Sequence, residues 1–291
     1  MKEQGFTIVE ISLFLGISGA LILLTLGLWT MVARQRFQDT MTTLRNTVQS
    51  EYEEVRTSIN ERLGKTTITG CKDDGTIGSG KDATGNSECL AIGKLIQFTP
   101  GSNEIKISYV VLTKAKLVDS YLGKGEIEIL REISNNTTDD NKPRLVVVGS
   151  TSNSSYVART SDPAIIPKNI RLQWGGEFAN SWTITDTPSK SNGMAILHSP
   201  ISGSVLAFSF ASNATPVSSG GVLNLASASV NQPVAIMIKN TQQGFKGGAV
   251  CIDGGSSSVV ARSAVPADPY YEFGNPTYSP TKENLKELCK V

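Results

Sequence analysis

The most prominent hydrophobic pattern lies close to the start of the chain. Residues 11–33 form a run of 23 residues without a formal charge. As a helix rising about 1.5 Å per residue, this run covers about 35 Å, against a membrane hydrocarbon core of about 30 Å. A cleaved secretory signal is the alternative, but its apolar part would span only about 7–15 residues. The pattern therefore favours a membrane-spanning helix over residues 6–33.

After residue 33 the apolar positions recur every three or four residues, with charged residues between them. This pattern predicts an amphipathic helix over residues 34–63, with Gly64 as its C-terminal cap. No proline precedes Pro100, so one continuous helix over 6–63 is expected. The steps drift from a strict seven-residue repeat, which favours packing on a folded domain over a coiled-coil stalk. The predicted stripe consists of Phe37, Met41, Leu44, Val48, Tyr52, Val55, Ile59 and Leu63.

From residue 90 onward, short alternating runs are separated by turn residues. They predict strands, and hence an α+β protein with a mostly antiparallel head over residues 64–291 and one sheet face available for the helix stripe. The dipeptides Pro100-Gly101, Asn192-Gly193 and Gly220-Gly221 are interpreted as turns. The predicted strands span residues 104–111, 125–133, 143–150, 169–174, 180–187, 204–210 and 233–240.

The remaining parts of the head have other patterns. Residues 64–89 are rich in Gly, Ser, Thr and Asp, which predicts an irregular loop. Residues 279–290 predict a short C-terminal helix, capped by Ser279 or Thr281. A subdivision of the head near residues 160–168 is also considered.

The four cysteines are Cys71, Cys89, Cys251 and Cys289. Their spacing does not suit a zinc site, so two disulfides are expected. Three pairings are possible, and the local one, Cys71–Cys89 with Cys251–Cys289, closes the shortest loops. Disulfides indicate an oxidising compartment outside the cytoplasm. Positive charges flanking the apolar run do not independently give this orientation.

Charge and composition argue against several functions. The formal net charge is +1, from 27 basic and 26 acidic residues, so a nucleic-acid partner is not expected. The chain has a single histidine, His198, and its Ser279-x-x-Lys282 spacing lacks the companion motifs of penicillin-binding enzymes. Asp73, Asp74 and Asp82 lack the spacing of a calcium hand. We therefore expect no enzymatic activity, no cofactor and no metal.

The N-terminus carries a more specific pattern: a short leader ending in Gly5, then "FTIVE", then the apolar helix. This resembles the signal segment of type IV pilins and pseudopilins. The resemblance implies that residues 1–5 are a leader removed by a prepilin peptidase after Gly5 and that the new N-terminus, Phe6, is methylated. It also implies a pilin-like fold and assembly through the helix. Where many members have a proline within the span, this chain has Gly27, which could loosen the helix.

Glu10 is a carboxylate near the start of the apolar run. A charge within a membrane span is costly and is usually paired. One interpretation is that Glu10 lies at the membrane interface and interacts favourably with the helix dipole. The other is that it pairs with the amine freed on Phe6, in the same chain or in a neighbouring subunit, and sets the register of assembly.

The sequence therefore predicts a structural subunit of a type IV pilus-like surface filament. Its expected partners are copies of itself, other pilins, the prepilin peptidase, the assembly platform and the membrane. It would be a single-pass protein of the cytoplasmic membrane before it joins an extracellular filament. The alternative is a minor pilin or pseudopilin whose head binds a host-cell surface or a secreted cargo.

Overall fold

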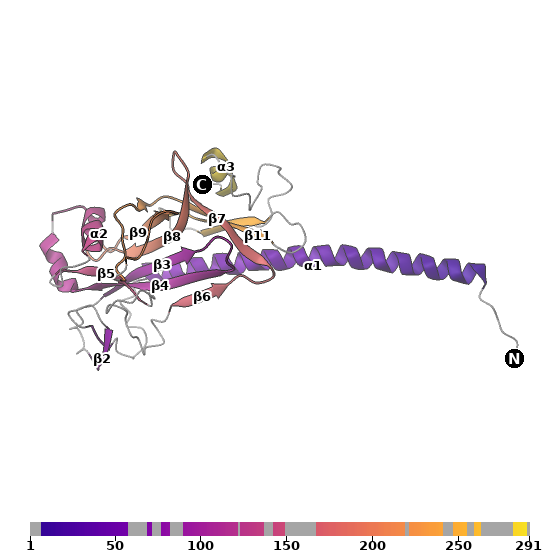
Figure 1. Cartoon of the computed structure of the whole chain (residues 1–291), viewed down its shortest axis with the longest axis horizontal. Helices are drawn as coiled ribbons and strands as arrows, with labels where there is room; N and C mark the ends of the chain where they lie inside the picture. The colour runs from indigo at the N-terminus through magenta and orange to yellow at the C-terminus, as the bar shows by residue number, and fades with distance from the viewer. Residues whose placement is uncertain are drawn as a thin grey trace.

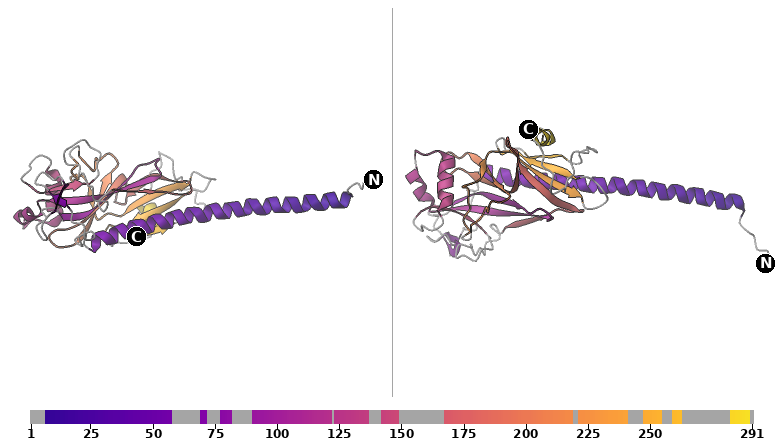
Figure 2. Two further views of the ribbon diagram at one scale, coloured as in Figure 1. Left: turned by 90° about the horizontal axis from the view of Figure 1, so that it is seen from below. Right: turned by 45° about the horizontal axis from the view of Figure 1, so that its top comes forward.

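The computed structural model describes most of the helix and head. The described residues are 7–57, 69–71, 77–81, 90–121, 123–136, 142–148, 167–218, 221–240, 247–254, 259–262 and 282–289. The first helix, α1 (Ile8–Arg56), is 49 residues long. Its first half extends away from the head as a single rod, and its second half runs along the sheet (Figures 1 and 2).

The predicted continuous helix is confirmed from residue 8 to residue 56. Thr57 forms the C-terminal cap, where its backbone N–H donates to the Glu53 carbonyl. The predicted last turns and the cap at Gly64 lie outside the described residues, as do stripe residues Ile59 and Leu63. All six stripe residues that the structure describes, Phe37 to Val55, are at most 2% exposed.

The head is built on an eleven-stranded sheet in which the described strand pairs are antiparallel. Along its main path the order is β13-β12-β11-β7-β8-β3-β4-β5, with β6 beside β4, β9 beside β8 and β10 beside β9. The proposed boundary near 160–168 falls largely outside the described residues, and strands from both sides of it join this sheet. The strands are β3 (Leu90–Phe98), β4 (Glu104–Thr113), β5 (Arg144–Val147), β6 (Lys168–Arg171), β7 (Gly176–Thr183), β8 (Ser189–His198), β9 (Val205–Ala211), β10 (Ser229–Val230), β11 (Val234–Asn240), β12 (Gly248–Ile252) and β13 (Val259–Arg262).

Apolar side chains that alternate along the strands form cores on both faces of the sheet. One face packs against the α1 stripe, with Ile96, Ile105 and Ile236 among the contributing strand residues. On the other face, strand residues that include Phe208 and Phe210 of β9 pack against a 3₁₀ helix η1 (Ala115–Tyr121) and α2 (Glu126–Asn135). A third, smaller core lies beneath the C-terminal helix α3 (Lys282–Cys289).

One predicted strand is wrong, because residues 125–133 contribute to helix α2. The alternation in "EIEI" suggested a strand, but the residues that are buried, Ile129, Leu130 and Ile133, follow helical spacing. Gly125 is the N-cap, and two glutamates in the first turn interact favourably with the helix dipole.

Two further expectations require correction. Asn192-Gly193 is not a turn but part of β8, where the register shifts between Ser191 and Gly193, as at a β-bulge. The segment 64–89 is not wholly irregular, because β1 (Thr69–Cys71) and β2 (Ile77–Lys81) form a small antiparallel pair. Their short, Gly-rich sequences lack the apolar alternation that would have predicted strands. The other predicted strands are found, with ends displaced by up to a few residues.

Candidate assembly helix and its anchorage in the head

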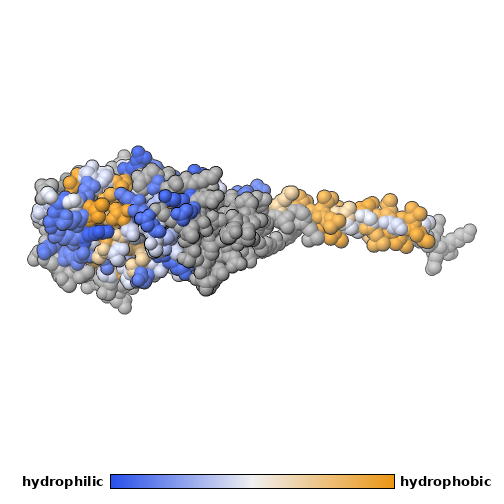
Figure 3. Space-filling model, turned by 90° about the horizontal axis from the view of Figure 1, so that it is seen from above, coloured by the Kyte–Doolittle hydropathy of each residue, from blue (hydrophilic) through white to orange (hydrophobic). Residues whose placement is uncertain are grey.

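The first half of α1 is apolar on all sides and exposed. Its described large apolar side chains include Leu23, which is 72% exposed, and Leu24, which is 63% exposed. The segment Ile8–Thr25 has a mean hydropathy of 2.2 and none of it is buried in the chain (Figure 3). Its length and composition suit a membrane-spanning helix, and an N-terminal signal sequence shares the same features. The structure thus contains one long apolar surface that its own head leaves uncovered.

Glu10 lies in the first turn of this exposed half and forms a capping box with Thr7. The Thr7 backbone N–H donates to Glu10 Oε2 at 2.9 Å, and the Thr7 hydroxyl donates to the same oxygen at 3.0 Å. In return, the Glu10 backbone N–H donates to Thr7 Oγ1 at 3.4 Å. Gly5 and Phe6 lie outside the described residues. The carboxylate is therefore held at the helix start, as a capping box requires.

Gly27, the other sequence-predicted residue of the span, lies within unbroken α-helix. Its loosening was expected in an assembled filament, and it stays a prediction for that state.

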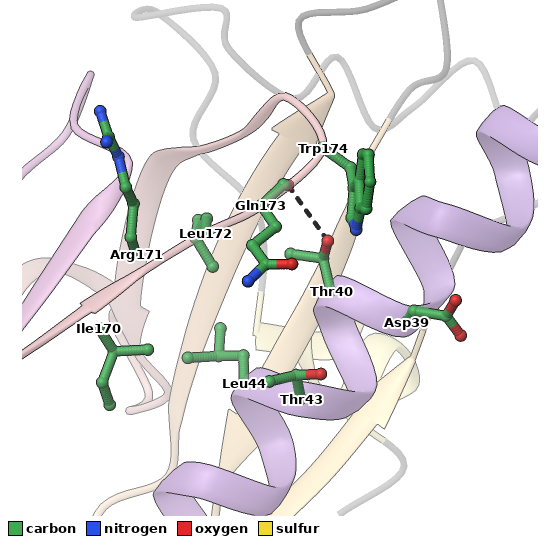
Figure 4. Close-up of a pocket in the computed structure, with 9 residues that line it drawn as sticks. All are labelled: Asp39, Thr40, Thr43, Leu44, Ile170, Arg171, Leu172, Gln173 and Trp174. Carbon is green, nitrogen blue, oxygen red and sulfur yellow. Dashed lines mark hydrogen bonds between the residues drawn. The ribbon is translucent and has the colours of Figure 1, made fainter.

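Where α1 reaches the head, it contacts the turn between β6 and β7. The Thr40 hydroxyl lies 3.1 Å from the Gln173 carbonyl oxygen, to which it donates (Figure 4). The next residue, Trp174, has a φ of +55° and is 47% exposed, and the Arg36 guanidinium carbon lies 4.4 Å from the centre of its ring. A small cavity of about 70 Å³ lies between α1 and this turn, lined by Thr43, Leu44 and their neighbours in Figure 4.

Deeper in the head, a buried cluster of charges joins α1 to the sheet. Lys94, fully buried on β3, forms ion pairs with Glu51 and, at 2.6 Å, with Glu54. Lys168 approaches the other Glu51 oxygen at 2.9 Å. The Tyr109 hydroxyl donates to Glu54 Oε1 at 2.8 Å, and its ring centre lies 4.8 Å from the Lys94 nitrogen. Two cations thus balance two carboxylates where the last turns of α1 meet the sheet.

The cluster shifts two pKa values in opposite directions. Burial alone would raise the pKa of Glu54, but hydrogen bonds from Lys94 and Tyr109 and the charges of Lys94 and Lys168 outweigh it, so the pKa is lowered. Burial raises the pKa of Tyr109, and its hydrogen bond to Glu54 and the nearby carboxylate charges raise it further. The native cluster therefore favours an ionised Glu54 beside a neutral Tyr109.

The predicted Cys251–Cys289 disulfide is present, with a Cα–Cα distance of 5.6 Å, and joins β12 to α3. The predicted Cys71–Cys89 pair cannot be followed, because Cys89 lies outside the described residues. His198 is the last residue of β8. Ser279, Asp73, Asp74 and Asp82 also fall outside the described part of the chain. Within that part, the structure brings together no group of three His, Cys, Asp or Glu residues suited to a metal ion.

Sequence reasoning missed the buried cluster. Glu51 and Glu54 were not distinguished from the other charged residues between the stripe positions, and Lys94 was not assigned to a strand. The usable signal was a lysine inside the apolar run "LAIGKLIQF", because lysine is rarely buried without a partner. Its main partner is 43 residues away along the chain, so the sequence did not identify it.

In comparisons with known proteins, no family model, no curated protein and no solved structure matches this chain.

Proposed function

We propose that this chain is the structural subunit of a type IV pilus-like filament. After a prepilin peptidase cuts behind Gly5 in the cytoplasmic membrane, the first half of α1 packs against the same half of other subunits. One observation carries the proposal: a single helix is built into the head along its second half and leaves its apolar first half exposed. A surface of that kind requires cover from a membrane or from other apolar helices.

The position of Glu10 supports this assignment. Cleavage after Gly5 would place a new amine on Phe6, directly beside Thr7, whose backbone N–H already donates to the Glu10 carboxylate. Both charges would then lie at the same end of the helix. In an apolar helix bundle an unpaired carboxylate is costly, so subunits would pack at the axial offset that brings an amine to it. The same pair explains how a charge is tolerated in the assembly surface.

The charge and capping functions of Glu10 can be separated with three variants. Glu10→Gln keeps an oxygen that accepts from Thr7 but removes the charge, whereas Thr7→Val removes the capping hydroxyl and keeps the charge. Glu10→Val removes both. The ion-pair proposal predicts that Glu10→Gln and Glu10→Val insert into the membrane but assemble at least tenfold less filament, while Thr7→Val assembles nearly as much as the parent.

Filament yield is measured in sheared surface material, with membrane insertion followed by fractionation. Normal assembly by Glu10→Gln would show that the carboxylate serves the helix cap and not an ion pair. Mass spectrometry of the assembled protein tests the processing step separately. A methylated Phe6 N-terminus is expected, and an intact Met1 in filaments would refute cleavage.

A further inference from the structure

We propose that the patch formed by Arg36 and Trp174, here called the base patch, contacts the phospholipid headgroup layer while α1 spans the membrane. The inference rests on the membrane-anchored stage of the proposed function, and it does not depend on filament assembly. It assigns a lipid-binding role to the end of the head from which the apolar half of the helix emerges (Figure 1).

The position of Arg36 along α1 is the first argument. The uncharged run ends at residue 33, and its length of about 35 Å slightly exceeds a hydrocarbon core of about 30 Å. Arg36 follows three residues later, about 5 Å farther along the helix axis. The headgroup regions extend the bilayer to about 40–45 Å in total, so each adds about 5–8 Å. With the run inside the hydrocarbon core, Arg36 falls within a headgroup layer.

The turn that carries Trp174 is fixed at the same level as Arg36. Its ring lies against the Arg36 guanidinium, and the preceding residue, Gln173, accepts the hydrogen bond from Thr40 one helical turn farther along (Figure 4). Trp174 adopts a positive φ, which is uncommon for a residue with a side chain, and Gly175 follows with a φ of +77°. The chain thus holds a large, half-exposed aromatic ring beside the point where the helix leaves the head.

The chemistry of the base patch suits phospholipid headgroups. Tryptophan is enriched at membrane interfaces because its ring is apolar and its N–H is polar. A guanidinium that stacks on an aromatic ring through its face can still donate from its edge to phosphate oxygens. Nearby, Lys239 pairs with Glu177 at 2.8 Å and Arg171 approaches Glu104 at 3.9 Å. Because these pairs balance, and Asp39 lies one helical turn after Arg36 and lines the cavity beside Trp174, we expect contact with a zwitterionic phosphatidylcholine surface without a requirement for anionic lipid.

Depth-dependent fluorescence quenching of the full-length chain in phosphatidylcholine vesicles tests the inference. In a Trp29→Phe parent, the remaining tryptophans are Trp174 and Trp182, and Trp182 is 4% exposed in the core beneath α3. The difference between this parent and the same chain with Trp174→Phe gives the Trp174 signal. We expect a nitroxide on the headgroup to quench that signal several-fold more than a nitroxide near the end of the acyl chain.

Arg36→Gln should reduce the headgroup quenching of Trp174 at least twofold. Arg45→Gln is the matched control, because Arg45 is an exposed arginine nine residues farther along the same helix, about 13 Å from the proposed contact. It should leave the quenching unchanged. Unfolding midpoints of both variants show whether the head remains folded. If Arg36→Gln retains the parent quenching, the arginine does not bind the lipid surface.

A chain that keeps Trp29 and carries Trp174→Phe reports whether the helix is inserted. Quenching of Trp29 without quenching of Trp174 would overturn the inference and leave the membrane anchor intact. No quenching of either residue would overturn both. A third outcome is that neither nitroxide quenches Trp174, while its emission maximum shifts to shorter wavelength in isolated filaments. This outcome would overturn the inference and assign the base patch to a contact between subunits.

Discussion

The two halves of α1 share one unbroken backbone but differ in what stabilises them. In the second half, charged residues separate an apolar stripe, and that stripe is buried against the sheet. In the first half, residues 11–33 carry no charge, and the described apolar side chains are exposed. A striped helix can be satisfied by one partner surface, whereas a helix that is apolar on all sides needs an apolar environment all round. The head therefore covers one half of α1 and leaves the apolar surface of the other half exposed.

The largest effect is expected where the buried half meets the sheet. Lys94→Ala removes the cation between Glu51 and Glu54 and leaves Glu51, which is 4% exposed, with Lys168 alone. Loss of one partner from a buried ion pair costs about 3–5 kcal/mol, so we expect the free energy of unfolding to fall by that amount. Urea denaturation of the full chain in detergent micelles, followed by near-ultraviolet circular dichroism, measures the loss.

The matched control replaces Lys94 and Glu51 together with apolar residues and leaves Lys168 and Glu54 to pair with each other. Lys94→Met combined with Glu51→Leu should be less destabilising than Lys94→Ala, because no unpaired carboxylate remains on Glu51. If the double variant is as unstable as Lys94→Ala, the loss comes from packing around Lys94 and not from the buried charge.

Substitution of one leucine in each half of α1 tests the comparison directly. Leu44 is 1% exposed and Leu24 is 63% exposed. Leu44→Ala should lower the free energy of unfolding of the head by about 3 kcal/mol, because it removes buried methyl groups and leaves a cavity. Leu24→Ala should change it by less than about 0.5 kcal/mol. Chemical denaturation in micelles compares the two, and equal losses would mean that the exposed half contributes to the stability of the head.

The sequence predicted the features that depend on neighbouring residues better than the features that depend on contacts between distant residues. The stripe from Phe37 to Val55 was predicted because helical periodicity is a property of neighbouring residues. Helix α2 was misread because "EIEI" satisfies the strand period over four residues, and burial by distant strands decides between the two. Asn192-Gly193 was interpreted as a turn, but these residues lie within β8, and the sheet accommodates them by a shift in register, as at a β-bulge. Local patterns thus predicted most helices and strands, but not α2 or the bulge within β8.

The sites show the same division. The position of Glu10 at the helix start and the Cys251–Cys289 pairing were accessible from local spacing. The contact between Arg36 and Trp174 joins residues separated by more than a hundred positions, and neither pattern nor charge indicated it. Such contacts exist only once the sheet has brought the β6–β7 turn to the helix. Sequence reasoning therefore predicted the exposed apolar half of α1 and missed the contacts by which the head holds the other half.

A smaller loss than those of Lys94→Ala and Leu44→Ala is expected for the hydroxyl at the edge of the buried cluster. Tyr109→Phe removes one hydrogen bond to the Glu54 carboxylate, so the free energy of unfolding should fall by about 1–2 kcal/mol near neutral pH. The folded state raises the pKa of Tyr109, whereas the unfolded chain has the ordinary value of about 10. Above pH 10 the unfolded chain releases this proton first, so the contribution of Tyr109 to stability is lost as the pH rises.

Denaturation at a series of pH values separates this contribution from that of Glu54. The parent should lose stability above about pH 10, and Tyr109→Phe should lose less over the same range. Glu54 has a lowered pKa, so its contribution is present above about pH 4.3 and is lost as the pH falls through its native value. Glu54→Gln should remove that acid dependence, whereas the Leu24→Ala chain should retain both limbs of the parent profile. A parent profile that stays flat above pH 10 would show that Tyr109 ionises as easily in the folded head as in the unfolded chain.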